Sequence, residues 1–292
     1  MTAFYKYQAA GNDFIILDST DAYRRGEGEA CIAYWQKRAK ALCDRHFGIG
    51  ADGILLVSNV PTAQADARMD IINADGSLAG MCGNGIRCAA RYLADRGNPM
   101  DAVSRIDTLG GLQRVRLING VKDYPIEVAM AKVLLGARDA YTTKDGTVFC
   151  GRHVDVGNPH FVIVNDAWQR EDAQKTIVQL HAVAEQYGDE LSHAPLFEDG
   201  ANIEFACLLP NKTAAMAVYE RGCGITLACG TGSTATGAVM MQDFGLEGDC
   251  TLHAEGGILR IKAPKKDEPH YRLCGDAVCV FEGWFGDEKR LE

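Results

Sequence analysis

The sequence predicts an α/β fold of the mixed α+β kind, built as two similar halves, each a mixed sheet wrapped around a central helix. Short strand-like segments outnumber helix-like ones along the 292 residues. Two helix-like runs are small and apolar on nearly every side, which is typical of buried helices. Each of these runs follows the same short turn, MCGNGIRC at residues 81–88 and ACGTGSTA at residues 228–235. The repeated turn predicts a repeated unit.

The first half is expected to begin with two strands, at residues 3–8 and 14–18, joined by a Gly-Asn turn. Apolar side chains then recur at spacings of three and four, which predicts one amphipathic helix over residues 29–46. Apolar runs next to glycine-rich loops predict the later strands. The remaining elements expected in this half are strands at 53–57, 68–73, 104–109 and 113–118, and a helix from about Cys82 to Asp95.

The second half is expected to repeat this plan. We expect strands at 124–130, 153–157, 160–164, 202–209, 214–220, 249–254, 258–263 and 271–281, and helices at 171–187 and 229–242. Turn residues without an apolar face, at 118–124, indicate the joint between the halves. The sequence therefore predicts one half at 1–121 and another at 122–279, with the last strand, about 280–292, as a candidate to return to the first half.

Charge and composition exclude several classes of function. The net charge is −9 with no basic block, which argues against a nucleic-acid partner and, more weakly, against an anionic membrane surface. The apolar runs are too short to span a membrane, and the N-terminus lacks a signal-peptide pattern, so we expect a cytoplasmic protein. Eleven cysteines, none spaced C-x₂-C, favour neither a disulfide framework nor a structural metal site.

The repeated turn places a cysteine at the start of each apolar helix. A helix N-terminus carries unpaired N–H groups and a partial positive charge, so it binds anions and lowers the pKa of a thiol beside it. Two such helices facing each other would offer a thiol to each face of a carbon next to a carboxylate. One thiolate would remove the α-proton and the other thiol would return a proton to the opposite face, which inverts the carbon.

A structural interpretation competes with this one, because glycines and buried cysteines also occur in tight turns without any chemistry. For a single turn that interpretation is the stronger. The matched pair, with each turn opening an apolar helix, favours the chemical interpretation for Cys82 and Cys229. Cys88 and Cys223 are expected to be core or supporting residues.

Several ordered motifs together resemble the diaminopimelate epimerase family, and the resemblance covers nearly the whole chain. They are GNDF at 11–14, CDRHFGIGADG at 43–53, NADGS at 73–77, CGNGIRC at 82–88, GNPHFV at 157–162, NIEF at 202–205, YERGCGITLACGTG at 219–232 and VFEGWF at 280–285.

The resemblance implies the activity and the site. It implies an isomerase that interconverts LL- and meso-diaminopimelate in lysine and cell-wall precursor biosynthesis, with its active site in the cleft between the halves. No cofactor and no metal are implied, the partner is a small amino-acid substrate, and a homodimer is the assembly to be considered. Cys82 and Cys229 would be the catalytic pair, and His160 and Glu220 would tune the thiols. The substrate-binding residues would be Asn12, Asn73, Gly83, Asn84, Asn158, Asn202, Glu220, Arg221, Gly230 and Thr231.

Two departures from the family pattern leave the substrate open. The family usually has glutamate where this chain has Ile225, and often an acid at Leu78. The alternatives are a same-fold racemase of another amino acid such as histidine, a less favoured proline-type racemase, a cysteine hydrolase that pairs one thiol with His160, and a binding module that holds a carboxylate at the helix starts.

Overall fold

The computed structural model of the protein describes residues 1–99, 103–118, 126–165 and 172–286. The chain forms two compact units, which we call unit 1 (Met1–Val128 with Gly275–Glu292) and unit 2 (Ala129–Cys274). The boundary expected between residues 121 and 122 lies outside the described residues.

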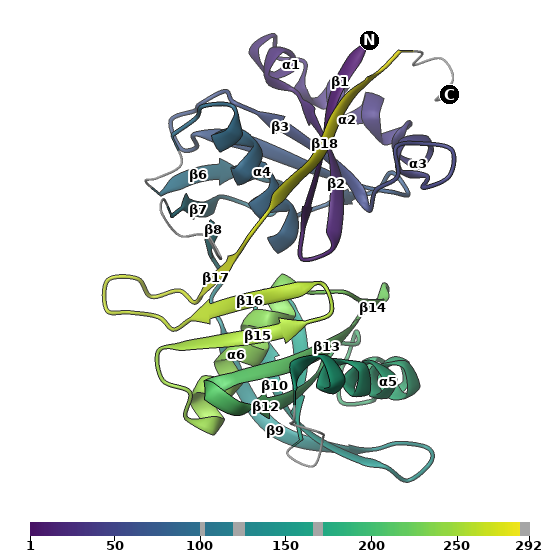
Figure 1. Ribbon diagram of the computed structural model, residues 1–292, viewed down its shortest axis with the longest axis vertical. Helices are drawn as coiled ribbons and strands as arrows, with labels where there is room; N and C mark the ends of the chain where they lie inside the picture. Colours follow the sequence, from purple (N-terminus) through teal and green to yellow (C-terminus); the bar gives the residue numbers. More distant parts are fainter. Residues whose placement is uncertain (100–102, 119–125, 166–171, 287–292) are drawn as a thin grey trace. The chain divides into compact units, whose positions relative to one another are not determined.

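Unit 1 combines a mixed sheet with four helices among its described residues. Its strands are β1 (Thr2–Ala9), β2 (Asn12–Asp18), β3 (Gly53–Ser58), β4 (Ala67–Asn73), β5 (Leu78–Ala79), β6 (Ser104–Asp107), β7 (Gln113–Leu117), β8 (Ile126–Ala129) and β18 (Val278–Phe285). Its helices are α1 (Thr20–Arg24), α2 (Gly28–Gln36), α3 (Ala39–Cys43) and α4 (Gly83–Asp95). The C-terminal strand β18 runs antiparallel beside β1 (Figure 1).

Unit 2 has the same kind of composition. Its strands are β9 (Leu134–Thr142), β10 (Val148–Asp155), β11 (Pro159–Val164), β12 (Asn202–Leu209), β13 (Thr213–Glu220), β14 (Gly224–Thr226), β15 (Asp249–Ala254), β16 (Gly257–Lys262) and β17 (Arg272–Gly275). Its helices are α5 (Ala173–Ser192), α6 (Gly230–Phe244) and the 3₁₀ turn η1 (Pro210–Lys212).

The two units share one strand topology. In unit 1 the order is β18, β1, β2, β3, β4, with only β2 and β3 parallel; β4 then pairs with the short β5 and runs parallel to β6, which leads to β7 and β8. In unit 2, β9 to β13 follow the same pattern, with β11 and β12 parallel, the short β14 beside β13, and a parallel β15 leading to β16 and β17. The helices α4 and α6 occupy the same place in this order, so the predicted duplication is confirmed.

Each of these two helices packs against its own sheet. Helix α4 contacts β1, β2, β3 and β4, and helix α6 contacts β10, β11, β12, β15 and β16. Ten residues of each helix are buried, which fits the small and apolar side chains that dominate both sequences. The expectation of a mixed sheet around a central helix is therefore confirmed in both units.

In unit 2 the two faces of the sheet have different partners. Odd-numbered side chains of β12 and β13, such as Ile203, Phe205 and Ala217, form one core with Ile177 and Leu180 of α5. Even-numbered side chains point to the other face, where α6 lies, because successive side chains of a strand alternate. A hydrogen bond from Ser233 in α6 to Met216 in β13 belongs to this second face. The strand alternation therefore decides which residues meet the cysteine helix.

The helix expected over residues 29–46 is wrong, because the chain forms two helices, α2 and α3, with a break at Lys37 and Arg38. The Arg38 N–H bonds to the Trp35 carbonyl, as in a 3₁₀ turn, while its guanidinium donates to the Tyr34 carbonyl and stacks 3.8 Å from the Tyr34 ring centre. The side chain thus takes the carbonyl that a continuous helix would give to the backbone.

Two strand expectations also need correction. The single strand expected at 271–281 is divided into β17 and β18, and in the gap between them the Asp276 carbonyl accepts a hydrogen bond from Arg87. The hairpin partner β9 was not expected, and β10 begins five residues earlier than predicted. Most side chains of β9 are exposed on both faces, so its sequence shows no apolar alternation.

Candidate active site

Cys82 and Cys229 are the N-cap residues of α4 and α6. Both have extended backbone conformations, and each sulfur accepts a hydrogen bond from the backbone N–H three residues later, Gly85 for Cys82 and Gly232 for Cys229, at 3.4 Å. A side chain that accepts from the third helical residue is the normal N-cap geometry. The prediction that each turn puts a cysteine at the start of a helix is confirmed.

The electrostatic expectation for Cys229 is wrong in direction. Cys229 is only 7% exposed, and this burial raises the pKa of its thiol well above the usual value. The nearby Glu220 carboxylate raises it further, while the hydrogen bonds with Thr231 and with the Gly232 N–H lower it without reversing the shift. A sequence pattern shows that the cysteine lies at a helix N-terminus, but it does not show how far the thiol is removed from water. That removal has the largest effect on the pKa of Cys229. Cys229 therefore holds its proton in the form described.

Among the carboxyl groups that act on Cys229, Glu220 has the larger effect on the pKa of the thiol. Burial raises the pKa of Glu220, and hydrogen bonds with Thr226 and Cys229 oppose that rise. The negative charge of Glu220 thus favours the protonated thiol of Cys229, and the hydrogen bond with Cys229 favours the ionised carboxylate of Glu220. The pKa of Cys229 therefore depends on the charge of Glu220, which agrees with the predicted tuning role of Glu220.

This environment predicts how Cys229 reacts with iodoacetamide. Because only the thiolate reacts and its pKa is raised, we expect alkylation of Cys229 in the ligand-free protein to keep accelerating as the pH rises to 9, without a plateau. Glu220→Gln removes a negative charge, so the pKa of Cys229 falls and alkylation at pH 8 becomes faster than in the native protein. Peptide mapping over time measures both rates. A plateau below pH 8, or slower alkylation in Glu220→Gln, would contradict this description.

One face of the unit 2 sheet carries three of the other predicted residues, His160, Asn202 and Glu220. His160 on β11 lies opposite Asn202 on β12, and Glu204 follows two residues later on the same face. Val218 of β13 lies opposite Glu204, so Glu220, two residues further, points the same way. This is the face covered by α6, so His160, Asn202 and Glu220 converge on the helix that begins with Cys229.

Hydrogen bonds fix these side chains. His160 is fully buried, with Nδ1 2.7 Å from Glu204 Oε1 and Nε2 3.0 Å from Asn158 Oδ1. The Asn202 side-chain oxygen accepts from the Arg221 N–H at 2.9 Å, which fixes the start of the turn after β13. The Arg221 guanidinium donates through Nη1 to the Asp199 carbonyl at 2.8 Å, so its orientation is set by backbone.

In unit 1 a buried arginine organises the start of α4. Arg87 has no exposed surface; it donates to the Asn84 side-chain oxygen and to the Gly83 carbonyl, each at 2.9 Å. The orientation of the Asn84 side-chain amide is thereby fixed by Arg87. In unit 2 His160 holds the oxygen of Asn158 in a comparable way.

Asn12 and Asn73 belong to different surroundings in unit 1. The side-chain oxygen of Asn12 is buried and has no hydrogen-bond partner among the described residues, which marks it as a candidate ligand contact. Asn73 is exposed and donates to the Ser77 hydroxyl at 2.9 Å. The sequence predicts both asparagines as substrate-binding residues. Of the two, only Asn12 has a buried side-chain atom without a hydrogen-bond partner among the described residues.

A charged network anchors the turn that holds Asn12. Asp13 contacts Lys6 at 2.7 Å and accepts two hydrogen bonds from Arg45, which also contacts Asp52 at 2.7 Å. Burial alone would raise the pKa of the Asp13 carboxyl, but the hydrogen bonds from Arg45 and Lys6 outweigh it, and the pKa lies well below its usual value. The network ties the GNDF turn to the loop at 44–53.

Sequence reasoning missed Glu204 and Arg87. Both are charged residues within otherwise apolar elements: Glu204 lies in the buried strand NIEFACLL, and Arg87 in the buried start of α4. Such residues are rarely buried unless they are paired, so the isolated charge in an apolar run was the available signal.

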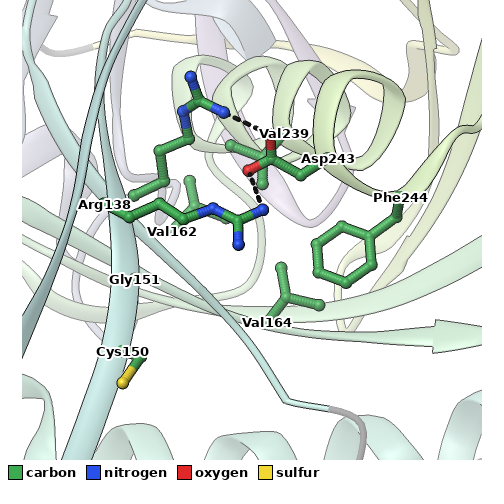
Figure 2. Close-up of a pocket in the computed structure, with 9 residues that line it drawn as sticks. Arg138, Cys150, Gly151, Val162, Val164, Val239, Asp243 and Phe244 are labelled. Carbon is green, nitrogen blue, oxygen red and sulfur yellow. Dashed lines mark hydrogen bonds and ion pairs between the residues drawn. The ribbon is translucent and has the colours of Figure 1, made fainter.

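A separate cavity in unit 2 has a volume of about 130 Å³ and lies among β10, β11 and α6. Asp243 contacts both Arg138, at 3.1 Å, and Arg152 there, and Figure 2 shows the Arg138 and Asp243 side chains directed toward each other. None of the predicted site residues lines it. Elsewhere in the described ranges, no three histidine, cysteine or acidic side chains are arranged to hold a metal ion.

No helix in the described part of the chain is long and apolar enough to cross a membrane.

Comparison with known proteins gives a consistent picture at the level of sequence. The sequence profile described as Diaminopimelate epimerase matches residues 4–134 and 152–280. A protein named diaminopimelate epimerase from Synechococcus sp. (strain JA-2-3B'a(2-13)) is 35% identical over 298 residues, covering 96% of this chain and 97% of that protein. One of the same name from Microcystis aeruginosa (strain NIES-843 / IAM M-2473) is 36% identical over 301 residues, covering 96% and 97%.

Solved structures share the fold at much lower identity. A PhzF family phenazine biosynthesis protein from Bacillus anthracis has a TM-score of 0.64 and 15% identity, covering 97% of this chain and 98% of that chain. A probable proline racemase from Agrobacterium radiobacter K84 has a TM-score of 0.63 and 12% identity, covering 98% and 93%. At these identities the likeness establishes the two-part mixed fold alone.

Proposed function

Because the chain belongs to the diaminopimelate epimerase family and is therefore an amino-acid epimerase, we propose that it interconverts LL- and meso-diaminopimelate, with Cys82 and Cys229 as the two acid–base groups. One observation carries the proposal: each unit presents a cysteine sulfur as the N-cap of a buried helix at the same place in a repeated topology. A duplicated acid–base group is what inversion of one carbon requires, since a single base tends to return the proton to the face it came from.

The proposed reaction moves one proton on each face of the α-carbon. The thiolate on one side takes the α-proton, breaking the C–H bond and forming an S–H bond, while the opposite thiol gives its proton to the carbon. Cys229 is the donor in the first such step because burial raises its pKa and keeps it protonated. After this step the first thiol carries the proton and Cys229 is the thiolate, which is the form that converts the product back. Before another molecule of the same starting isomer can react, the two thiols must exchange protons with solvent. The charge that develops on the substrate carboxylate is stabilised by the N–H groups of Gly83–Asn84 and Gly230–Thr231.

The proposed substrate contacts suit a molecule with an amino-acid group at each end. Neutral amides of Asn12, Asn73, Asn158 and Asn202 can both donate and accept. Arg221 uses Nη1 for backbone carbonyls, which leaves its other nitrogens to grip a distal carboxylate. Glu220 pairs with a substrate ammonium group and also tunes the Cys229 thiol. His160 tunes the thiol from the same face of the sheet.

Ile225 and Leu78, the two departures from the family pattern, occupy matching positions in the short strands β14 and β5. Ile225 lies directly opposite Tyr219, and Leu78 directly opposite Ile72. Residues directly opposite in an antiparallel pair share a face, and Tyr219 packs on the α5 side, away from Glu220 and α6. Ile72 likewise belongs to the core on the α2 and α3 side. Both positions thus lie on the face away from the cysteine helix.

From this placement we expect Ile225→Glu to change kcat/KM for diaminopimelate by less than about threefold, as surface substitutions usually do. The measurement compares diaminopimelate with histidine, methionine and lysine, for the native protein and the variant. Faster turnover of any of the three other amino acids by the native protein would replace diaminopimelate with another substrate of a same-fold racemase. A large gain for diaminopimelate in Ile225→Glu would show that the position does reach the substrate.

The proposal itself is tested by incubating the native protein with LL- and with meso-diaminopimelate in D₂O and following both isomers. Approach to the same mixture from either isomer, with deuterium at the α-carbon, is the expected result. Binding without exchange would indicate a carboxylate-binding module, and acylation by a reactive ester would indicate a cysteine hydrolase. We place the reaction in lysine and cell-wall precursor biosynthesis. We place it in the cytoplasm because it requires two reduced thiols.

A further inference from the structure

We propose that Glu204 is a positioning residue of this site: acting through His160, it fixes the side-chain amide of Asn158 in the orientation that binds the substrate. The inference rests on the proposed function, in which Asn158 contacts substrate. Glu204 lies outside the set of residues that the sequence predicted, and nothing in the proton transfers above uses it.

The three side chains form one hydrogen-bonded chain. Glu204 Oε1 lies 2.7 Å from His160 Nδ1, and His160 Nε2 lies 3.0 Å from Asn158 Oδ1. The Glu204 and His160 side chains have no exposed surface. A buried carboxylate is costly unless it is paired, and His160 is the partner that the structure gives it. The pairing therefore fixes the orientation of the imidazole ring.

Both ring nitrogens of His160 face oxygen atoms. An ionised Glu204 and the Asn158 side-chain oxygen can both accept only from a ring with a proton on each nitrogen, donating at Nδ1 to Glu204 and at Nε2 to Asn158, and this is the arrangement that the proposal assigns. With its oxygen held by His160, Asn158 directs its NH₂ group away from the ring, and an NH₂ group is what a substrate carboxylate needs.

A neutral residue at position 204 would change this outcome. In Glu204→Gln the side-chain oxygen still accepts from Nδ1, but the ring no longer has an anion beside it and keeps a proton only there. Nε2 then becomes an acceptor, so Asn158 turns its NH₂ group toward the ring and its oxygen toward the substrate. The expected result is weaker binding of the substrate rather than slower chemistry.

Glu204 also lies close to the first turn of α6, and its charge acts on Glu220 and Cys229. A Cβ atom added at Gly232 would lie 2.6 Å from Glu204 Oε1, so the glycine is what allows the helix to approach the carboxylate. Through this approach Glu204 could act on Cys229 instead of Asn158. Such an effect would appear in kcat and would not depend on Asn158, so the two routes give different kinetics.

The kinetic test uses Glu204→Gln, Asn158→Ala and the double variant, with diaminopimelate as substrate. We expect Glu204→Gln to raise KM about 10-fold with kcat within about twofold of native, the size of one lost charge-assisted hydrogen bond. In the Asn158→Ala background the same substitution should leave KM unchanged. Multiplicative effects in the double variant, or an effect on kcat alone, would overturn the proposal. Glu255→Gln is the matched control, because Glu255 lies 3.0 Å from His181 in a second, more exposed pair of unit 2.

A second measurement needs no activity. In the ligand-free native protein labelled with ¹⁵N-histidine, NMR should show a proton on each ring nitrogen of His160, identified by the signals that His160→Gln lacks. Glu204→Gln should retain only the Nδ1 proton. A single ring proton in the native protein would overturn the inference even if that variant does not fold. Absence of diaminopimelate turnover by the native protein would instead contradict the proposed function, and the NMR result would still decide the role of Glu204.

Discussion

Replacing Cys82 or Cys229 with serine should lower epimerisation by about 10²–10⁴-fold, the usual contribution of one acid–base group, while the fold is retained. Serine is a good N-cap and can accept the hydrogen bond that each sulfur accepts from Gly85 or Gly232. It cannot exchange a proton with the α-carbon as a thiol does. Initial rates with each diaminopimelate isomer measure the loss, and thermal unfolding measures the fold.

Alanine at the same two positions separates capping from catalysis. Cys82→Ala and Cys229→Ala should lose as much activity as the serine variants, and in addition about 0.5–2 kcal/mol of stability, since alanine cannot cap. Cys150→Ser is the control, because Cys150 is exposed on β10 and takes no part in either cap. If a serine or alanine variant of either capping cysteine kept more than about a tenth of the native rate, the thiol replaced in that variant would not be an essential acid–base group. The two-thiol proposal would then be contradicted.

Mild oxidation should join Cys82 to Cys229 and abolish activity completely, and a thiol reductant should restore it. Two thiols that act on opposite faces of one carbon must come close together, and a disulfide forms only when the Cα atoms lie within about 7 Å. Peptide mapping of the oxidised protein identifies the pair. Because the proposed reaction uses both sulfurs, the loss of activity should follow formation of this bond quantitatively.

Cys223→Ser is the control for oxidation, since Cys223 is exposed and lies six residues before Cys229. This variant should be inactivated by oxidant and reactivated by reductant as the native protein is. A bond between Cys223 and Cys229 in the native protein, with Cys82 still reduced, would show that the two capping thiols do not meet.

The architecture was predictable because its signals are local and repeated. The turns before Cys82 and Cys229, and the nearly uncharged helices after them, identify a duplicated unit with a buried helix in each copy. Strand alternation also explains, once the register is known, why His160, Asn202 and Glu220 share a face. The pattern could not supply that register, because it depends on which strands pair.

Features set by tertiary contacts were not predictable. The break between α2 and α3 depends on Arg38 donating to the Tyr34 carbonyl, and an apolar periodicity contains no information about that bond. The direction of the Cys229 pKa shift depends on burial, which outweighs the helix N-terminus. The partners of Glu204 and Arg87 also needed the structure, which places Glu204 beside the His160 ring nitrogen Nδ1 and shows Arg87 donating to the Asn84 side-chain oxygen.

Two different thiols acting on opposite faces of one carbon would leave their mark in the position of deuterium during the first turnovers. Starting in D₂O from a single isomer of diaminopimelate, the account predicts that the newly formed isomer carries deuterium at the inverted α-carbon while the remaining substrate still carries hydrogen there. The incoming deuteron comes from the second thiol, which has exchanged with solvent, and the original proton leaves on the first. Deuterium appearing in the remaining substrate as fast as product forms, or product that retains the original hydrogen, would contradict the two-thiol account.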